Sequence, residues 1–327
     1  MADPDALFSA PQRALLLQAE RADPRTAADL LIKLAASFLR AGQTAQFAEC
    51  FKRSYALRPI GQLSRLLHAS GNPRSAAVEL HEIALTLLQH GVTYAPVLAA
   101  LAITEAQLGH VNAVRRLIDF ERFFHHGTCT PPAGMSTEDF YGMLVSEIKS
   151  DLKFYEKPDD GAIRHSWRRD NVLEAKTPAL RALRRMMQAE VDRYIAALPD
   201  DPSHPFIAAR PTRSSLIGWA VVSDADGYLV PHIHPDAWIT GIYYVAQPEV
   251  SRSSQRGWLR IGPPDRYNFR SEDGWDTLML EPTRGTFLLM PAYFHHATEP
   301  MGVKQERISI AFDVRYSELR RLNHEGQ

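Results

Sequence analysis

The stretch from Val230 to Trp238 concentrates side chains that can bind a metal ion. It reads Val-Pro-His-Ile-His-Pro-Asp-Ala-Trp and contains His232, His234 and Asp236. On an extended strand alternate side chains project to the same face, so all three could point to one side. Imidazole nitrogens and carboxylate oxygens suit a borderline ion such as Fe(II), Mn(II) or Zn(II). The stretch predicts part of a metal site that needs a further ligand from elsewhere in the chain.

A second histidine pair, His295-His296, can supply that ligand, and an arginine follows it. Eleven residues after His296, Arg307 opens the run Arg-Ile-Ser-Ile-Ala-Phe. Two histidines and one more ligand can hold one face of a metal ion and leave positions open for a co-substrate and O₂. The planar fork of an arginine can pair with both oxygens of a carboxylate at once. The pattern predicts a metal centre whose co-substrate carries a carboxylate.

Short runs of β-branched and aromatic residues are expected to position these side chains. Dipeptides and tripeptides typical of turns, such as Asp-Gly and Thr-Arg-Gly, separate the runs. The expected strands are residues 215–223, 238–246, 257–261, 277–281, 285–290 and 307–315. Many short strands with few helices between them predict a barrel or jelly roll.

Residues 215–315, about a third of the chain, resemble the 2-oxoglutarate/Fe(II)-dependent oxygenases, whose core is a double-stranded β-helix. The likeness rests on Trp-Ala-Val-Val at 219–222, Pro-His-Ile-His-Pro-Asp-Ala-Trp-Ile-Thr-Gly-Ile-Tyr-Tyr-Val at 231–245, Met-Pro-Ala-Tyr-Phe-His-His-Ala-Thr-Glu-Pro at 290–300 and Glu-Arg-Ile-Ser-Ile-Ala-Phe-Asp-Val at 306–314. The departures are mild: Thr240 stands where the family pattern has serine, and Met-Pro-Ala at 290–292 replaces Phe-Pro-Ser.

The resemblance implies a role for each matching residue. His232 and His296 match metal ligands, and Arg307 matches the arginine that binds the distal carboxylate of 2-oxoglutarate. Ser309 lies beside that arginine, and Tyr244 matches a tyrosine that hydrogen-bonds the same carboxylate. The implied cofactors are Fe(II), with 2-oxoglutarate as co-substrate, and O₂. No catalytic residue beyond the metal ligands is implied.

The third metal ligand stays open between three arrangements. His234 stands where most of these oxygenases have aspartate, which gives the set His232, His234 and His296. His234-Pro-Asp236 is itself a His-x-Asp sequence, which gives His234, Asp236 and His296. In the third arrangement, water or another group completes a site built on His232 and His296. The remaining histidines, including His81 and His110, show no ligand spacing and are expected to be surface or packing residues.

The N-terminal part of the chain has helical periodicity. Apolar stripes with helical spacing lie on both sides of Gly42 and of Gly109, so each glycine is predicted to separate the two helices of a pair. A less regular unit covers residues 63–89. These units resemble tetratricopeptide repeats. The fold class expected is therefore α+β multidomain, with an all-α helical-repeat domain (1–127) followed by an oxygenase domain (128–327, core 215–315). Further helices are expected over residues 137–157 and 177–198.

Composition limits the possible partners and setting of the chain. The formal net charge of −1 does not indicate a nucleic-acid partner, and no apolar run is long enough to span a membrane. Cys50 and Cys129 fit neither a zinc nor a redox motif. The first residues lack the basic and apolar regions of a signal peptide, so a cytoplasmic protein is expected.

Three functions follow from these patterns. The first is a hydroxylase whose helical repeats capture a protein or peptide substrate. The second is another metal-dependent jelly-roll enzyme, such as a cupin-type isomerase or a dioxygenase without a co-substrate, which would not need Arg307. The third is an interaction protein whose helical repeats bind a partner while the barrel is vestigial.

Overall fold

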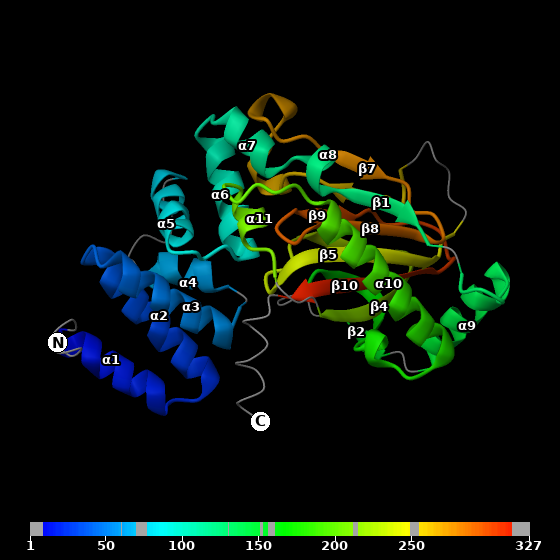
Figure 1. Ribbon diagram of the computed structural model, residues 1–327, viewed down its shortest axis with the longest axis horizontal. Helices are drawn as coiled ribbons and strands as arrows, with labels where there is room; N and C mark the ends of the chain where they lie inside the picture. Colours follow the sequence, from blue (N-terminus) through cyan, green and yellow to red (C-terminus); the bar gives the residue numbers. More distant parts are fainter. Residues whose placement is uncertain are drawn as a thin grey trace.

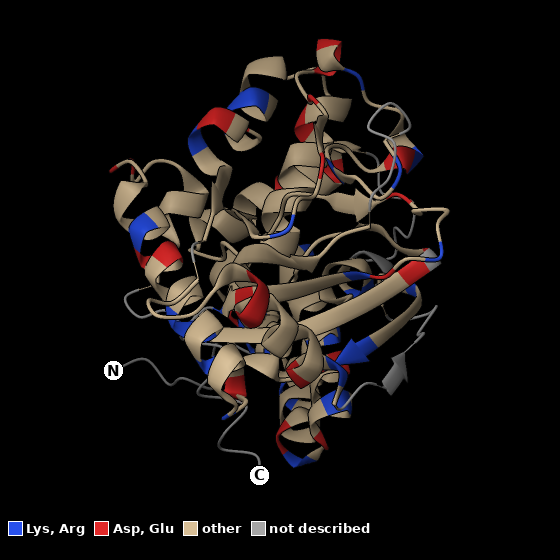
Figure 2. Cartoon of the chain, turned by 90° about the vertical axis from the view of Figure 1, so that its right-hand side faces the viewer, with Lys and Arg blue, Asp and Glu red and all other residues tan. Residues whose placement is uncertain are grey.

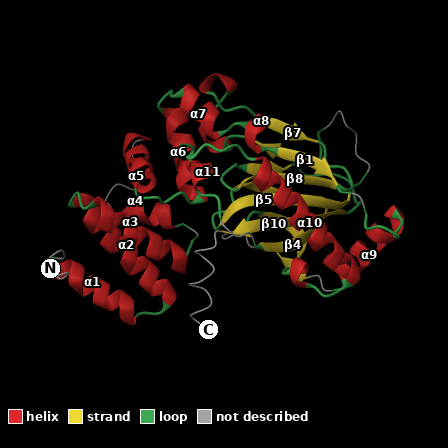
Figure 3. Ribbon diagram, in the orientation of Figure 1, coloured by secondary structure: helices red, strands yellow, loops and turns green. Residues whose placement is uncertain are grey.

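Helices make up the N-terminal part of the chain, and a curled antiparallel sheet makes up most of the C-terminal part (Figures 1 and 3). The computed structural model describes residues 9–59, 61–69, 77–129, 131–150, 153–155, 161–211, 215–248 and 255–315. The side chains of residues 67–69, 153–155 and 225 are outside that description.

The N-terminal helices pack as neighbours along the chain. They are α1 (Ala10–Arg21), α2 (Pro24–Arg40), α3 (Thr44–Leu57), α4 (Gln62–Ala69), α5 (Ala77–Gln89), α6 (Ala95–Gln107), α7 (Val111–Leu117) and α8 (Phe120–Phe123). Helix α2 contacts α1, α3 and α4, and α6 contacts α5 and α7. Gly42 and Gly109 join paired helices with φ of +70° and +74°, a backbone conformation that glycine adopts without strain. The predicted helical region is confirmed, while its tetratricopeptide character stays a prediction.

One sheet, antiparallel at every described pairing, contains the strands that position the candidate site. They are β1 (His125–Thr128), β2 (Lys153–Tyr155), β3 (Ile163–Arg169), β4 (Leu216–His232), β5 (Ala237–Ala246), β6 (Leu259–Ile261), β7 (Leu278–Leu280), β8 (Thr286–Pro291), β9 (His296–Thr298) and β10 (Arg307–Arg315). Their order is β1-β8-β5-β10-β4-β9-β6-β7, and β3 pairs with both β2 and β4.

The long strand β4 joins the two halves of the curled sheet. Residues 216–223 pair with β10, whereas Leu229 and His232 pair with Thr298 and His296 of β9. A strand that changes partner along its length is compatible with the predicted jelly roll. The switch brings the end of β4 next to the start of β9.

Two longer helices lie beside the sheet, α9 (Thr137–Lys149) and α10 (Pro178–Ala197), and Figure 1 shows α10 across one face. The helix predicted over 177–198 is confirmed by α10. The helix predicted over 137–157 is wrong beyond Lys149, because residues 153–155 instead pair with β3 as β2. Residues 151, 152, 156 and 157 of that prediction lie outside the described residues.

The helical region and the sheet share one apolar core. The domain boundary predicted between residues 127 and 128 falls inside β1, which pairs with β8. Phe120 packs edge-on against Phe294 at a centroid distance of 5.6 Å. The Tyr293 hydroxyl donates a hydrogen bond to the Leu117 carbonyl at 2.5 Å. The N-terminal helices therefore contact the strands and turns that carry the candidate site.

Charged segments of both signs are visible in one view of the described residues, and both cysteines are buried. Basic and acidic segments are interspersed over the helices in Figure 2, in keeping with a net charge of −1. Across the described residues, no helix has both the length and the hydropathy needed to cross a membrane. Cys50 and Cys129 are free and buried, and burial raises the pKa of Cys50 to about 11 and that of Cys129 to about 12.

Candidate metal and co-substrate site

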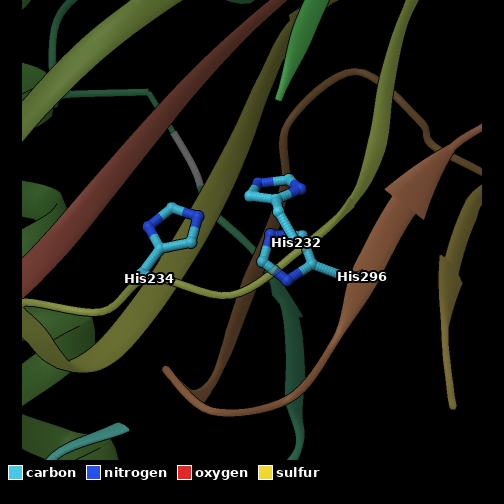
Figure 4. Close-up of side chains that lie close together, drawn as sticks. All are labelled: His232, His234 and His296. Atoms are coloured by element: carbon cyan, nitrogen blue, oxygen red, sulfur yellow. The ribbon is translucent and has the colours of Figure 1, made fainter. Parts of the chain in front are cut away.

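Three histidines converge where β4, its following turn and β9 meet. His232 ends β4, His234 lies in the connection to β5, and His296 opens β9. One ring nitrogen from each lies within 4.8 Å of those of the other two (Figure 4). The expectation that residues 232, 234 and 236 share one strand face is wrong, because β4 ends at His232. His234 reaches the cluster because the chain turns after the strand.

Each ring of this triad is oriented by an oxygen acceptor for its Nδ1. His232 Nδ1 lies 2.8 Å from the Val230 carbonyl, and His296 Nδ1 lies 3.0 Å from the Phe294 carbonyl. His234 Nδ1 lies 2.6 Å from a carboxylate oxygen of Asp313. With the proton on Nδ1, each imidazole donates to its oxygen and keeps the Nε2 lone pair for a metal ion.

Burial and the neighbouring carboxylate set the protonation of these histidines. Burial lowers the pKa of His232 to about 3 and lowers that of His296 well below its ordinary value. Burial alone would also lower the pKa of His234, but the Asp313 carboxylate outweighs it and raises that pKa. His232 and His296 are therefore neutral near pH 7, as a metal ligand must be.

Asp313, on β10, is a site residue that sequence reasoning missed. It is 3% exposed, and the Thr240 hydroxyl lies 3.1 Å from the same His234 nitrogen. A signal was present, because Arg307, Ser309 and Asp313 occupy alternate positions of one strand and therefore share a face. The carboxylate adds next to His234 the negative charge that three neutral histidines lack.

Asp236 lies away from the histidine cluster. Its Oδ2 lies 2.7 Å from Nη2 of Arg315, at the other end of β10 from Arg307. Within the described residues, the cluster of potential ligands at this position contains the three histidines and does not contain Asp236. Of the three arrangements left open by the sequence, this geometry fits His232, His234 and His296.

A cavity of about 300 Å³ extends from the triad to Arg307, Ser309 and Tyr244. Arg307 is 2% exposed and donates to the Gly257 carbonyl at 3.1 Å and to the Thr298 hydroxyl at 3.2 Å. Both acceptors are neutral, and no described carboxylate pairs with its charge. A buried cation without an anion is costly, so this end of the cavity suits an anionic ligand.

Tyr244 adds a second group that is open to a ligand. Its hydroxyl is buried without a hydrogen-bond partner among the described residues, and burial raises its pKa to about 12. Ser309 is its register partner on β10, which places the two side by side. One guanidinium and two hydroxyls on the same wall match the hydrogen-bonding needs of a carboxylate.

Strands β4 and β3 add an aromatic and a charged side chain to the cavity, on the same sheet face as Ser309 and Tyr244. Trp219 stacks on the ring of His234 at a centroid distance of 5.6 Å, and the Arg168 guanidinium lies 4.8 Å from the Trp219 centroid. Trp219 is half-buried and lines the cavity. Trp238 is buried, and its Nε1 donates to the Phe206 carbonyl at 2.8 Å.

Residues 218–313 match the family described as "Putative 2OG-Fe(II) oxygenase". The match contains all three histidines of the triad, Arg307 and Asp313. Oxygenases of this family use Fe(II), 2-oxoglutarate and O₂, and the histidine triad fits the metal ion. No curated protein sequence matches the chain significantly.

Several solved structures are similar to the chain at low identity. A prolyl-4-hydroxylase of Pseudomonas putida is 16% identical, with 61% of this chain and 95% of that chain covered and a TM-score of 0.40. A prolyl hydroxylase of Trichoplax adhaerens, in complex with a hypoxia inducible factor peptide, is 12% identical, with 67% and 94% covered and a TM-score of 0.43. HygX of Streptomyces hygroscopicus, with nickel, 2-oxoglutarate and hygromycin B bound, is 14% identical, with 62% and 87% covered and a TM-score of 0.38.

Proposed function

We propose that the chain is a 2-oxoglutarate- and Fe(II)-dependent oxygenase in which His232, His234 and His296 hold the iron. Bound Fe(II) supplies the activation of O₂, coupled to conversion of 2-oxoglutarate into succinate and CO₂, that oxidises a substrate C–H bond. Two features support the ligand set: the mutual proximity of the three histidines and the acceptor at each Nδ1.

The observation that carries the proposal is buried Arg307 at the far end of the cavity from the triad. Its guanidinium has no described anionic partner, and it binds the distal carboxylate of 2-oxoglutarate in this proposal. The Tyr244 hydroxyl donates to the same carboxylate, and Ser309 lies beside both. These groups fix one end of the co-substrate so that its other end faces the histidines.

For the reaction type we propose hydroxylation, with a protein or peptide as the substrate. The support is architectural, because the helical region contacts the turn that carries His234. The Tyr55 hydroxyl of α3 donates a hydrogen bond to the Pro235 carbonyl in that turn. A peptide bound across the helices would lie next to the metal-bearing loop. Incubation of cell-extract peptides with the enzyme, Fe(II) and 2-oxoglutarate should yield products heavier by one oxygen atom in mass spectrometry.

Replacing Arg307 tests the co-substrate site directly. Removing a buried charge partner costs about 2–5 kcal/mol, so Arg307→Ala should weaken 2-oxoglutarate binding by at least about thirtyfold. Calorimetry with Mn(II) in place of Fe(II) measures this binding without turnover. The exposed Arg193, far along α10, provides the control Arg193→Ala, which should bind as the unchanged protein does.

Succinate formation by the same variants gives the second readout. The Arg307→Ala protein should still bind Mn(II) while losing succinate production, because the histidines stay intact. Unchanged 2-oxoglutarate affinity and turnover in Arg307→Ala would contradict the proposal and favour a metal-dependent jelly-roll enzyme that uses no 2-oxoglutarate.

A further inference from the structure

A second cluster of metal-binding side chains lies in the helical region. His81 belongs to α5, Glu105 to α6, and His110 directly precedes α7. Their spacing along the chain offers no reason to group them, and both histidines were expected to be surface or packing residues. Packing of α6 against α5 and α7 brings the three together.

The donor atoms of this cluster converge on the Glu105 carboxylate. His81 Nε2 lies 2.9 Å from Oε1, and His110 Nδ1 lies 2.5 Å from Oε2. One ligand atom from each residue lies within 4.8 Å of the other two. Two ligands of a tetrahedral ion at about 2.0–2.1 Å stand ~3.3 Å apart. Both described contacts to the carboxylate are shorter than this spacing, so the side chains would have to move apart to admit an ion.

Glu105 is a buried carboxylate with which a metal ion could pair. The residue is 8% exposed, and the ion pairs described for it are with His81 and His110. Buried carboxylates are compensated by a paired charge or by a metal ion. A divalent cation bound to both imidazoles and the carboxylate would satisfy the charge and the lone pairs together.

We propose that His81, Glu105 and His110 form a second divalent-metal site, separate from the histidine triad, that takes Zn(II). Two imidazole nitrogens and one carboxylate oxygen suit this ion and leave the fourth tetrahedral position for water. Glu105 also lines a cavity of about 650 Å³ that can admit this water.

The proposed ion would cross-link three helices and, through α7, the rest of the molecule. Helix α7 packs against the 3₁₀ helix η5 (Ser271–Asp273), which lies between β6 and β7. Gly274, at the end of η5, approaches the Val111 backbone so closely that a Cβ there would lie 2.7 Å from its carbonyl oxygen. Zinc is therefore expected to stabilise the junction between the helices and the sheet.

Zinc stoichiometry of the full-length chain tests the site. The chelator-stripped protein is saturated with Zn(II), freed of unbound metal by gel filtration and measured by mass spectrometry of the metal. His81→Ala/His110→Ala and Glu105→Gln should each bind one equivalent less than the unchanged protein. His126→Ala, at an exposed histidine outside both clusters, should bind the same amount.

Two further measurements separate loss of zinc at the second site from zinc binding at the triad and from misfolding of the variants. His232→Ala/His296→Ala should retain one equivalent, which identifies the second site even if the proposed oxygenase site fails. Glu105→Gln keeps the size of the side chain, so circular dichroism can verify its fold, and zinc should no longer raise its melting temperature. Unchanged zinc stoichiometry in both Glu105→Gln and His81→Ala/His110→Ala would overturn the site and leave a hydrogen-bonded histidine–carboxylate network.

Discussion

The Asp313 carboxylate determines much of the charge at the histidine triad. Three neutral imidazoles bring no negative charge to a metal ion, whereas a triad with aspartate brings one. Asp313 supplies a negative charge without contacting the metal position, because its carboxylate accepts a hydrogen bond from His234 Nδ1. Carboxylate–histidine pairs of this kind fix the ring and make the imidazole a stronger donor. The pair therefore belongs to the candidate metal site although Asp313 does not touch the position of the metal.

Asp313→Asn should weaken metal binding while leaving the three ligands in place. The amide can keep a hydrogen bond to His234, but it removes the negative charge. Loss of such a partner typically lowers metal affinity by about 10–100-fold. Mn(II) titration followed by electron paramagnetic resonance measures the dissociation constant. The exposed Asp192→Asn, on α10, serves as a control with the same change in net charge. Equal Mn(II) affinity in both variants would exclude this role for Asp313.

Among the strands, close approach of β5 to β10 depends on a glycine. Gly241 of β5 is the register partner of Phe312, and a Cβ at Gly241 would lie 2.1 Å from the Phe312 ring. The opposite face of β10 carries Arg307 and Asp313 into the cavity. A shift of β10 would therefore displace groups at both ends of the candidate site.

Gly241→Ala should destabilise the fold for this reason. Overpacking of a buried contact typically costs about 1–3 kcal/mol, and the strand must move to relieve it. Urea unfolding measures the free energy. Gly142, exposed in α9 with no neighbouring atom within 4 Å of the point where a Cβ would lie, provides the matched control. Gly142→Ala should gain up to about 1 kcal/mol from helix propensity. A stable Gly241→Ala protein would show that β5 and β10 are not held at this spacing.

The strands also show what sequence alone could predict. The prediction for β10 covers the residues it occupies, because its apolar and polar positions alternate. The prediction for β4 stops at residue 223, since Asp226-Gly227 resembles a turn. The strand continues to His232 because β3, a charged strand that was not predicted, pairs along it. A Cβ at Gly227 would lie 2.7 Å from the Ser166 hydroxyl, so this glycine permits close strand contact instead of a turn.

The sequence could predict those residues of the candidate site that residue type and short-range spacing identify. His232, His296 and Arg307 stand out by residue type and order. The choice between His234 and Asp236 depends on how the chain turns after β4, which periodicity does not encode. Asp313 was missed because its partner is 79 residues away in sequence. Contacts of this range are determined by the fold as a whole.

At the scale of the whole molecule, the helical region holds the turn that carries His234. The Tyr55 hydroxyl of α3 donates to the Pro235 carbonyl, and the ring stacks on Tyr94 at a centroid distance of 4.2 Å. Tyr55 is 1% exposed, so water cannot readily replace this hydrogen bond. The helices are therefore expected to position the turn that carries His234 as well as to bind a partner.

Tyr55→Phe tests this coupling, because it keeps the aromatic stack and removes the hydroxyl. An unpaired buried carbonyl costs about 1–3 kcal/mol, and part of that cost should appear as weaker Mn(II) binding. Tyr194→Phe is the matched control, since its hydroxyl donates to the Phe123 carbonyl at 2.7 Å in a buried position away from the triad. Both variants should lose similar free energy of unfolding, whereas Mn(II) affinity should fall several-fold only in Tyr55→Phe. Equal Mn(II) affinities would mean that the helical region packs against the turn without positioning the metal ligands.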